Sequence, residues 1–294
     1  MKRAIFILLL GLGFALTGVV FGQNENGTTN NEAKLEFNAA NKAFKEGKVD
    51  LAIEKYKAAI QIDPSFALAY YWMGNAYRKN EDYVSAAKAY EGAIQKNGKM
   101  AEAYTALGYA QAKQQKHNDA LNSYKAALSI DPKDAKAHWG MGEVYRDQKN
   151  FTQAVESYKK AVEADPAYAN AWKDMGGSFM ELGQYENAVE AFLNALQNIR
   201  VKTQAGDVYY RLGNAYFELK KYDEAEQAYN DCLTNARQSL LKAGANFGLG
   251  EIYKKRGNSQ RALQYYQEAS KDRNWKKAAE HEIELLRNPD KYAY

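Results

Sequence analysis

Histidine and cysteine, which often act as general bases, nucleophiles and ligands of transition metals, are few in this 294-residue sequence. The candidates are three histidines and one cysteine: His117, His138, His281 and Cys232. His281 is followed by glutamate, as in a helical zinc-protease motif, but Leu285 stands where the second histidine must lie. One cysteine can form neither an internal disulfide nor a zinc-binding cysteine cluster. We therefore predict no metal site.

Phosphate-binding loops are absent as well. No Gly-Lys-Ser or Gly-Lys-Thr sequence occurs, and Gly11-Leu-Gly13 falls inside an apolar segment at the amino terminus. Catalysis needs acid, base or nucleophile groups that converge in a pocket, and this chain offers few. We therefore predict no catalytic residues and no cofactor, and we expect a protein that is not an enzyme.

Composition indicates what kind of scaffold carries these residues. Hydrophobic residues make up 46% and charged residues 26%, which is typical of a folded chain and too apolar for a disordered one. Only 4 prolines occur, with abundant Ala, Lys, Glu, Gln and Tyr and no strand-type alternation of Val, Ile and Thr. This composition favours helices over strands. We predict an all-α protein.

A period of 34 residues runs through the chain. Consecutive blocks begin at 67, 101, 135 and 169, and each places its key residues at the same offsets. A glycine recurs at one offset, as Gly74, Gly108, Gly142 and Gly176. An aromatic residue recurs sixteen places later, as Tyr90, Tyr124, Tyr158 and Phe192. A fixed period of this length is typical of a stacked array of repeats.

The pattern resembles the tetratricopeptide repeat (TPR) family, whose unit reads W-x2-L-G-x2-Y, then A-x3-F, an alanine and a proline near its end. Three further blocks extend the match to seven repeats over 33–276. Their ranges are 33–66, 67–100, 101–134, 135–168, 169–205, 206–242 and 243–276. The resemblance implies a right-handed superhelical α-solenoid of helical hairpins, in which small residues let two helices approach and aromatic rings fill the space between them.

Two intervals depart from the period. The Leu-Gly or Met-Gly pairs that end at Gly176, Gly213 and Gly250 lie 37 residues apart, three more than the period. Three residues are about one helical turn. No proline follows the second helix in repeats five and six, whereas Pro64 and Pro132 end those of repeats one and three. We therefore predict that the second helices of repeats five and six run one turn longer, through 199–202 and 237–241.

The amino terminus has the features of an export signal. Two basic residues, Lys2 and Arg3, precede an uncharged apolar run over 4–22, which fits a signal peptide cleaved after Gly22 or an uncleaved anchor. A flexible linker is predicted over 23–32. Export predicts a periplasmic or cell-envelope location in a bacterium rather than release into the medium, with membrane contact only through an uncleaved segment.

The carboxyl terminus is predicted to close the array. A helix is expected from Trp275 to Leu286, with residues 277–294 forming a capping helix and tail. The formal charge of +4 includes Lys2 and Arg3, so a processed chain would carry 4 − 2 = +2, with acids and bases interleaved. No basic stripe is present, so we expect no nucleic-acid partner.

The TPR resemblance also implies where a partner binds. In that family, positions 2, 5, 9, 12 and 13 of the first helix of each unit face a concave groove. Carried over by position, the candidate groove residues are Phe37, Asn41, Tyr71, Asn75, Arg78, Lys79, Tyr109, Lys113, Trp139, Glu143, Arg146, Tyr210, Asn214 and Phe247. Exposed aromatic rings in a groove provide contact area at low entropic cost, although several of these rings could instead pack against a neighbouring repeat.

These residues favour a protein-protein interaction scaffold that binds a peptide segment or a partner protein in its groove. Asn41 and Asn75 match the asparagines of chaperone-binding TPR domains, but Phe37, Thr105 and Tyr109 replace the basic residues of that carboxylate clamp. The alternative is a self-assembling structural protein, which would form a homo-oligomer by stacking repeats end to end. The resemblance also gives structural roles to His138, in an aromatic position, and to Cys232, in a small-residue position.

Overall fold

The computed structural model describes residues 27–201 and 205–288. These two ranges contain fifteen α-helices and no β-strand. The helices are α1 Asn31–Lys45, α2 Val49–Ile62, α3 Ala67–Lys79, α4 Tyr83–Lys96, α5 Ala101–Lys113, α6 His117–Ile130, α7 Ala135–Asp147, α8 Phe151–Ala164, α9 Ala169–Glu181, α10 Tyr185–Asn198, α11 Ala205–Glu218, α12 Tyr222–Asn235, α13 Ser239–Lys255, α14 Ser259–Ala269 and α15 Lys276–Arg287. The predicted signal segment, the start of the linker and the last six residues lie outside this description.

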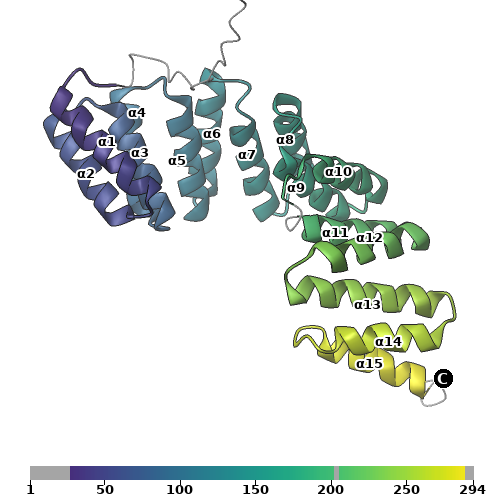
Figure 1. Cartoon of the computed structure of the whole chain (residues 1–294). Coiled ribbons are helices and arrows are strands. Elements are labelled where there is room, and N and C mark those ends of the chain that lie inside the picture. The colour runs from purple at the N-terminus through teal and green to yellow at the C-terminus, as the bar shows by residue number, and fades with distance from the viewer. Residues whose placement is uncertain (1–26, 202–204, 289–294) are drawn as a thin grey trace, which may run out of the picture.

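Consecutive helices pair into seven antiparallel hairpins, α1 with α2 through α13 with α14. The hairpins stack in order, and α15 packs on α14 at the end of the array (Figure 1). The stack runs in one direction from α1 to α7 and then turns, so that α11 to α15 extend away from the first row (Figure 1). This architecture confirms the predicted α-solenoid, including its final helix.

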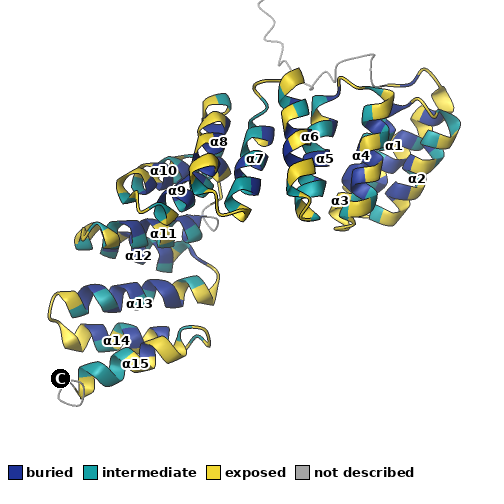
Figure 2. Ribbon diagram, turned by 180° about the vertical axis from the view of Figure 1, so that it is seen from behind, coloured by how far each residue is buried: buried dark blue, intermediate teal, exposed yellow. Residues whose placement is uncertain are grey.

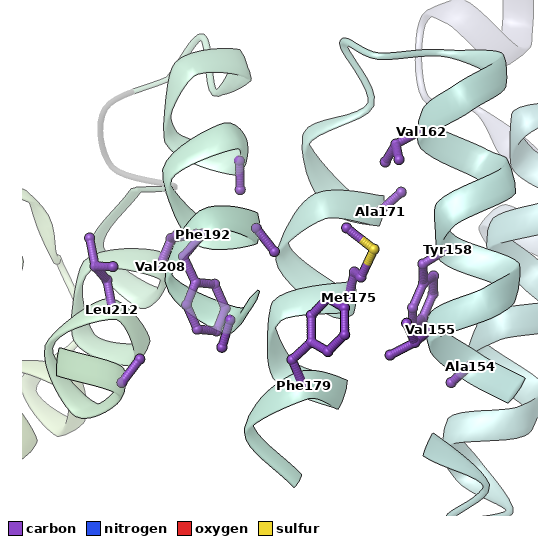
Figure 3. Packing of buried hydrophobic residues seen from close by; sticks show 14 of the residues in the cluster. Ala154, Val155, Tyr158, Val162, Ala171, Met175, Phe179, Phe192, Val208 and Leu212 are labelled. Atoms are coloured by element: carbon purple, nitrogen blue, oxygen red, sulfur yellow. The ribbon is translucent and has the colours of Figure 1, made fainter. Parts of the chain in front are cut away.

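The core is continuous along the stack. Figure 2 shows buried residues on the faces that helices turn toward their neighbours and exposed residues on the outer faces. In each of six hairpins, the aromatic ring of the second helix lies against the glycine of the first. A Cβ atom at Gly74 would lie 2.5 Å from Cε1 of Tyr90, a ring with no exposed surface. Figure 3 shows buried apolar side chains of neighbouring helices in this core, among them Tyr158 of α8, Met175 of α9 and Phe192 of α10.

Every hairpin turns through the same backbone motif. In the fourth, the N–H of Lys149 donates to the carbonyl of Arg146, and the N–H of Asn150 donates to that of Tyr145. These two bonds form a Schellman motif, which needs a left-handed residue after the helix. Glycine supplies it at 47, 183 and 257, whereas Glu81, Gln115, Lys149 and Lys220 adopt a positive φ without being glycine.

Replacing Lys149 by glycine is therefore expected to stabilise the fourth hairpin by about 0.5–1 kcal/mol, because a left-handed conformation is costly for a residue with a Cβ atom. Urea denaturation followed by circular dichroism would measure the change. Gly183→Lys, at the equivalent position in the fifth hairpin, should lower stability by a similar amount. Equal stabilities for wild type and Lys149→Gly would contradict the prediction.

The prediction of longer second helices is wrong. Both α10 and α12 contain 14 residues, as do α4, α6 and α8. The additional residues lie after them. Residues 199–201, which follow α10, are not helical, residue 202 lies outside the described residues, and α13 begins at Ser239, which makes it a 17-residue helix. At the end of α12, the residue that follows the helix, Ala236, packs closely on Gly206 of α11.

The linker is also shorter than predicted, because α1 begins at Asn31 rather than after residue 32. Asn30 caps this helix by accepting hydrogen bonds from the N–H groups of Glu32 and Ala33. Thr28 is buried, and its hydroxyl oxygen accepts from the N–H of Asn30. Among the described residues, no helix has both the length and the apolar character needed to cross a membrane.

Candidate interaction groove

The first helices of the hairpins form the inner side of the curved array. Between neighbouring hairpins, α5 meets α7, α9 meets α11, and α11 meets α13. Second helices of neighbouring described hairpins do not approach one another this closely. An array curves toward the side on which its repeats lie closer together, so the first helices face the concave side.

A hollow of about 540 Å³ opens on the first helices of repeats four to six. Trp139, Glu143 and Arg146 of α7 line it, together with Asp174 and Gly177 of α9. The first three are predicted groove residues. The structure therefore brings positions 5, 9 and 12 of repeat four together around one hollow.

Four of the five aromatic residues at position 5 pack on the second helix of their own hairpin, whereas Trp139 packs on Tyr168. Ring centroids lie 5.7 Å apart for Phe37 and Tyr56, and 5.8 Å apart for Tyr71 and Tyr90. Tyr210 and Phe247 are 6.3 Å and 5.3 Å from the corresponding rings. Phe37 is 9% exposed and so belongs to the core rather than to the groove surface. The other position-5 rings, including Trp139, are half-buried and keep one part accessible.

Position 9 has a structural role that sequence reasoning missed. The hydroxyl of the second-helix tyrosine donates to the side chain at this position: Tyr56 to Asn41 at 2.6 Å, Tyr90 to Asn75 at 3.0 Å and Tyr229 to Asn214 at 2.8 Å. Tyr158 and Tyr266 donate to Glu143 and Glu251 in the same way. Asn75 is buried and therefore not on the groove surface.

The sequence contains a sign of this pairing. Repeat five has Phe192 in place of the second-helix tyrosine, and its position 9 is Gly177, which has no acceptor. The loss of the hydroxyl coincides with the loss of its partner. Repeat three has Tyr109 at position 9 instead of an amide or a carboxylate.

Three of the four basic residues at positions 12 and 13 of repeats one to three lie on aromatic rings. The guanidinium of Arg78 lies 5.6 Å from the ring centroid of Tyr109, and the ammonium of Lys113 lies 5.5 Å from it. Lys79 lies 4.8 Å from the ring of Phe44. Such cation–π contacts position an exposed cation without pairing it with a carboxylate. These three predicted residues are exposed.

Four side chains around the hollow form one paired network. Asp174 accepts a hydrogen bond from Nε1 of Trp139 at 2.9 Å and lies 3.5 Å from Arg146. Arg146 also contacts Glu143 at 2.7 Å. Burial raises the pKa of Glu143, and nearby Asp174 raises it further, whereas Tyr158 and Arg146 oppose that shift. The network holds Trp139 in a fixed orientation at the edge of the hollow.

The structure shows the surroundings of His138 and Cys232, which lie in different repeats. Within the described ranges, no three His, Cys, Asp or Glu side chains are grouped closely enough to hold a metal ion. Nε2 of His138 lies 3.1 Å from the carbonyl oxygen of Pro132, near the end of the preceding repeat. Cys232 is fully buried in the core of repeats six and seven.

Burial raises the pKa of the Cys232 thiol to about 12, so almost no thiolate forms near neutral pH. Because only the thiolate reacts with alkylating agents, iodoacetamide should label the native protein at least about a thousandfold more slowly than the urea-unfolded protein. Mass spectrometry of both states over time would measure the ratio. Similar labelling rates in the two states would contradict the prediction.

Family models match most of the repeat array. A TPR repeat model matches residues 40–81, and tetratricopeptide repeat models match 68–99, 105–169, 167–238 and 207–274. The chain belongs to the tetratricopeptide repeat family. A search of the curated proteins finds no match.

Solved structures share the TPR fold at low sequence identity. The C-terminal part of a TPR repeat-containing protein from Cytophaga hutchinsonii has a TM-score of 0.67 and 17% identity, covering 84% of this chain and 99% of that one. PilW, described as a widely conserved type IV pilus biogenesis factor, has a TM-score of 0.62 and 18% identity, covering 70% and 94%. MamA has a TM-score of 0.51 and 23% identity, covering 58% and 94%. At these identities the similarity establishes the fold.

Proposed function

We propose that this TPR protein is an exported, non-catalytic scaffold of the cell envelope that binds a segment of a partner protein on the concave side of its first helices. The observation that supports this best is the hollow lined by Trp139, Glu143 and Arg146, because it joins a partly exposed aromatic ring to oriented charged groups. Aromatic and arginine side chains of this kind dominate the energetics of protein interfaces.

Two further observations support parts of the proposal. The basic and apolar amino-terminal segment supports export, and PilW, a similar structure, is described as a pilus biogenesis factor. The absence of a grouped metal-binding set among described residues, together with the buried thiol, leaves few groups for catalysis. The partner is expected to be a protein, since acids and bases are interleaved over the sequence as a whole and its formal net charge is only +4.

Affinity capture from an envelope extract tests the function. The bait is residues 23–294, compared with a groove variant in which Tyr71, Arg78 and Trp139 are changed to alanine. A matched variant changes Lys88, Lys159 and Leu193, exposed residues of second helices, to alanine. Circular dichroism would confirm that both variants keep their helices.

We expect wild type and the second-helix variant to capture the same partner and the groove variant to lose it. Loss from the second-helix variant alone would place binding on the outer surface and overturn the groove proposal. Capture of the same chain and nothing else would favour self-assembly instead.

A further inference from the structure

The groove changes sign along its length. Positions 9, 12 and 13 of repeats one to three contain four cations and no carboxylate, whereas the same positions of repeats four to six contain four carboxylates and one cation. The cations of the first set are Lys45, Arg78, Lys79 and Lys113, which total +4. The charged residues of the second set are Glu143, Arg146, Asp147, Glu181 and Glu218, which total −4 + 1 = −3.

The four cations of repeats one to three have no ion-pair partner among the described residues. No carboxylate of the described residues lies within ion-pair distance of Lys45, Arg78, Lys79 or Lys113. All four residues are exposed. Two acids in the hairpin turns have other partners: Glu46 pairs with Lys48, and Asp82 caps α4. By contrast, Arg146 of repeat four contacts Glu143 and Asp174.

Helix stability alone does not explain the reversal. Cations in the last turn of a helix interact favourably with its dipole, and carboxylates there do not. This effect would favour cations equally in α9 and α11, which instead have Glu181 and Glu218 in the last turn. A role in binding accounts both for the cations of repeats one to three and for the carboxylates of repeats four to six.

Aromatic rings lie among the cations of the first three repeats. Tyr109 is contacted by Arg78 and Lys113, and Phe44 by Lys79. Trp72 adds a third ring, and its ring centroid lies 6.1 Å from that of Phe44. These rings belong to α1, α3 and α5, which lie together at one end of the array (Figure 1). The surface can contact carboxylates and apolar side chains at the same time.

We propose that repeats one to three form an acidic-segment site, in which Lys45, Arg78, Lys79 and Lys113 bind a partner segment that alternates carboxylates with aromatic side chains. The inference rests on the proposed function and specifies the chemistry of the partner. The carboxylates of repeats four to six repel such a segment and confine it to the amino-terminal half of the groove.

Fluorescence anisotropy with a defined peptide tests the site on residues 23–294. The probe is a fluorescein-labelled peptide that repeats Glu-Tyr-Gly four times, and its control has glutamine in place of each glutamate. The test variant is Arg78→Glu with Lys79→Glu. The matched variant is Lys88→Glu with Lys159→Glu, which makes the same change in net charge on second helices.

The acidic probe is expected to bind wild type and the second-helix variant alike, and to bind the groove variant at least about tenfold more weakly. The glutamine probe should bind wild type at least about tenfold more weakly than the acidic probe. Raising the salt from about 0.05 M to about 0.2 M should weaken acidic-probe binding, because exposed charges are then screened.

Any of three results would overturn the inference. Wild type could bind the acidic and glutamine probes equally, the two charge reversals could have equal effects, or wild type could fail to bind the acidic probe. These results would leave the proposed function standing if envelope capture still depended on Tyr71 and Trp139. Loss of that dependence would overturn the proposed function itself.

Discussion

Replacing Gly176 by alanine is expected to destabilise the protein by about 1–3 kcal/mol, while the same change at the adjacent Gly177 is expected to stabilise it by up to about 1 kcal/mol. A Cβ atom at Gly176 would lie 2.6 Å from Cε1 of Phe192, and that ring has no exposed surface into which it could move. A Cβ atom at Gly177 would meet only Nη1 of Arg211, at 3.7 Å.

The two glycines share α9, so each variant is the control for the other. Urea denaturation followed by circular dichroism would measure both changes. Because repeat arrays can unfold in parts, hydrogen exchange of α9 and α10 should accompany it and show faster exchange for Gly176→Ala. Destabilisation of equal size in both variants would mean that helix propensity and core packing do not act as proposed.

The hairpin fold could be predicted because its determinants are local and recur. Each repeat needs a small residue where two helices approach and a large ring to fill the space between them, and Gly176 with Phe192 shows both in contact. The spacing of sixteen residues between them fixes how much helix and turn separates the two contact points. Prediction of the α-solenoid therefore required only the period and the residue types.

The location of the inserted turn could not be predicted in the same way. The interval from Gly213 to Gly250 shows how many residues were added, but not where the helix stops. The structure shows why α12 ends before Ala236. A Cβ atom at Gly206 would lie 2.6 Å from the Cα of Ala236, so the chain after α12 packs directly on α11. That contact is tertiary and leaves no local signal such as a proline.

The sequence predicted which face of the first helices forms the candidate groove. It did not predict which side chains on that face are exposed. The helical period places positions 5 and 9 on the inner side, but it does not show that the ring of Phe37 reaches Tyr56 or that Asn75 meets the hydroxyl of Tyr90. These contacts depend on the reach of side chains from the second helix. The sequence held one indication, the joint change to Phe192 and Gly177, which required comparison between repeats.

Asn75→Ala is expected to destabilise the protein by about 1–3 kcal/mol, because it leaves the buried hydroxyl of Tyr90 without its acceptor. Asn75 is 6% exposed and Tyr90 is fully buried, with 3.0 Å between the hydroxyl and Oδ1. Burial raises the pKa of Tyr90, so the hydroxyl stays protonated and continues to need an acceptor. Adding Tyr90→Phe removes the unsatisfied donor and should recover part of the loss.

A double-mutant cycle measured by urea denaturation tests this interpretation, since residues in direct contact show non-additive effects. Strictly additive losses in the double variant would show that the hydrogen bond contributes nothing measurable. The same double variant also separates structure from binding. If Asn75 acts only through Tyr90, the double variant should capture the envelope partner as wild type does. Loss of capture by this stable variant would show that Asn75 contacts the partner directly, despite its burial in the free protein.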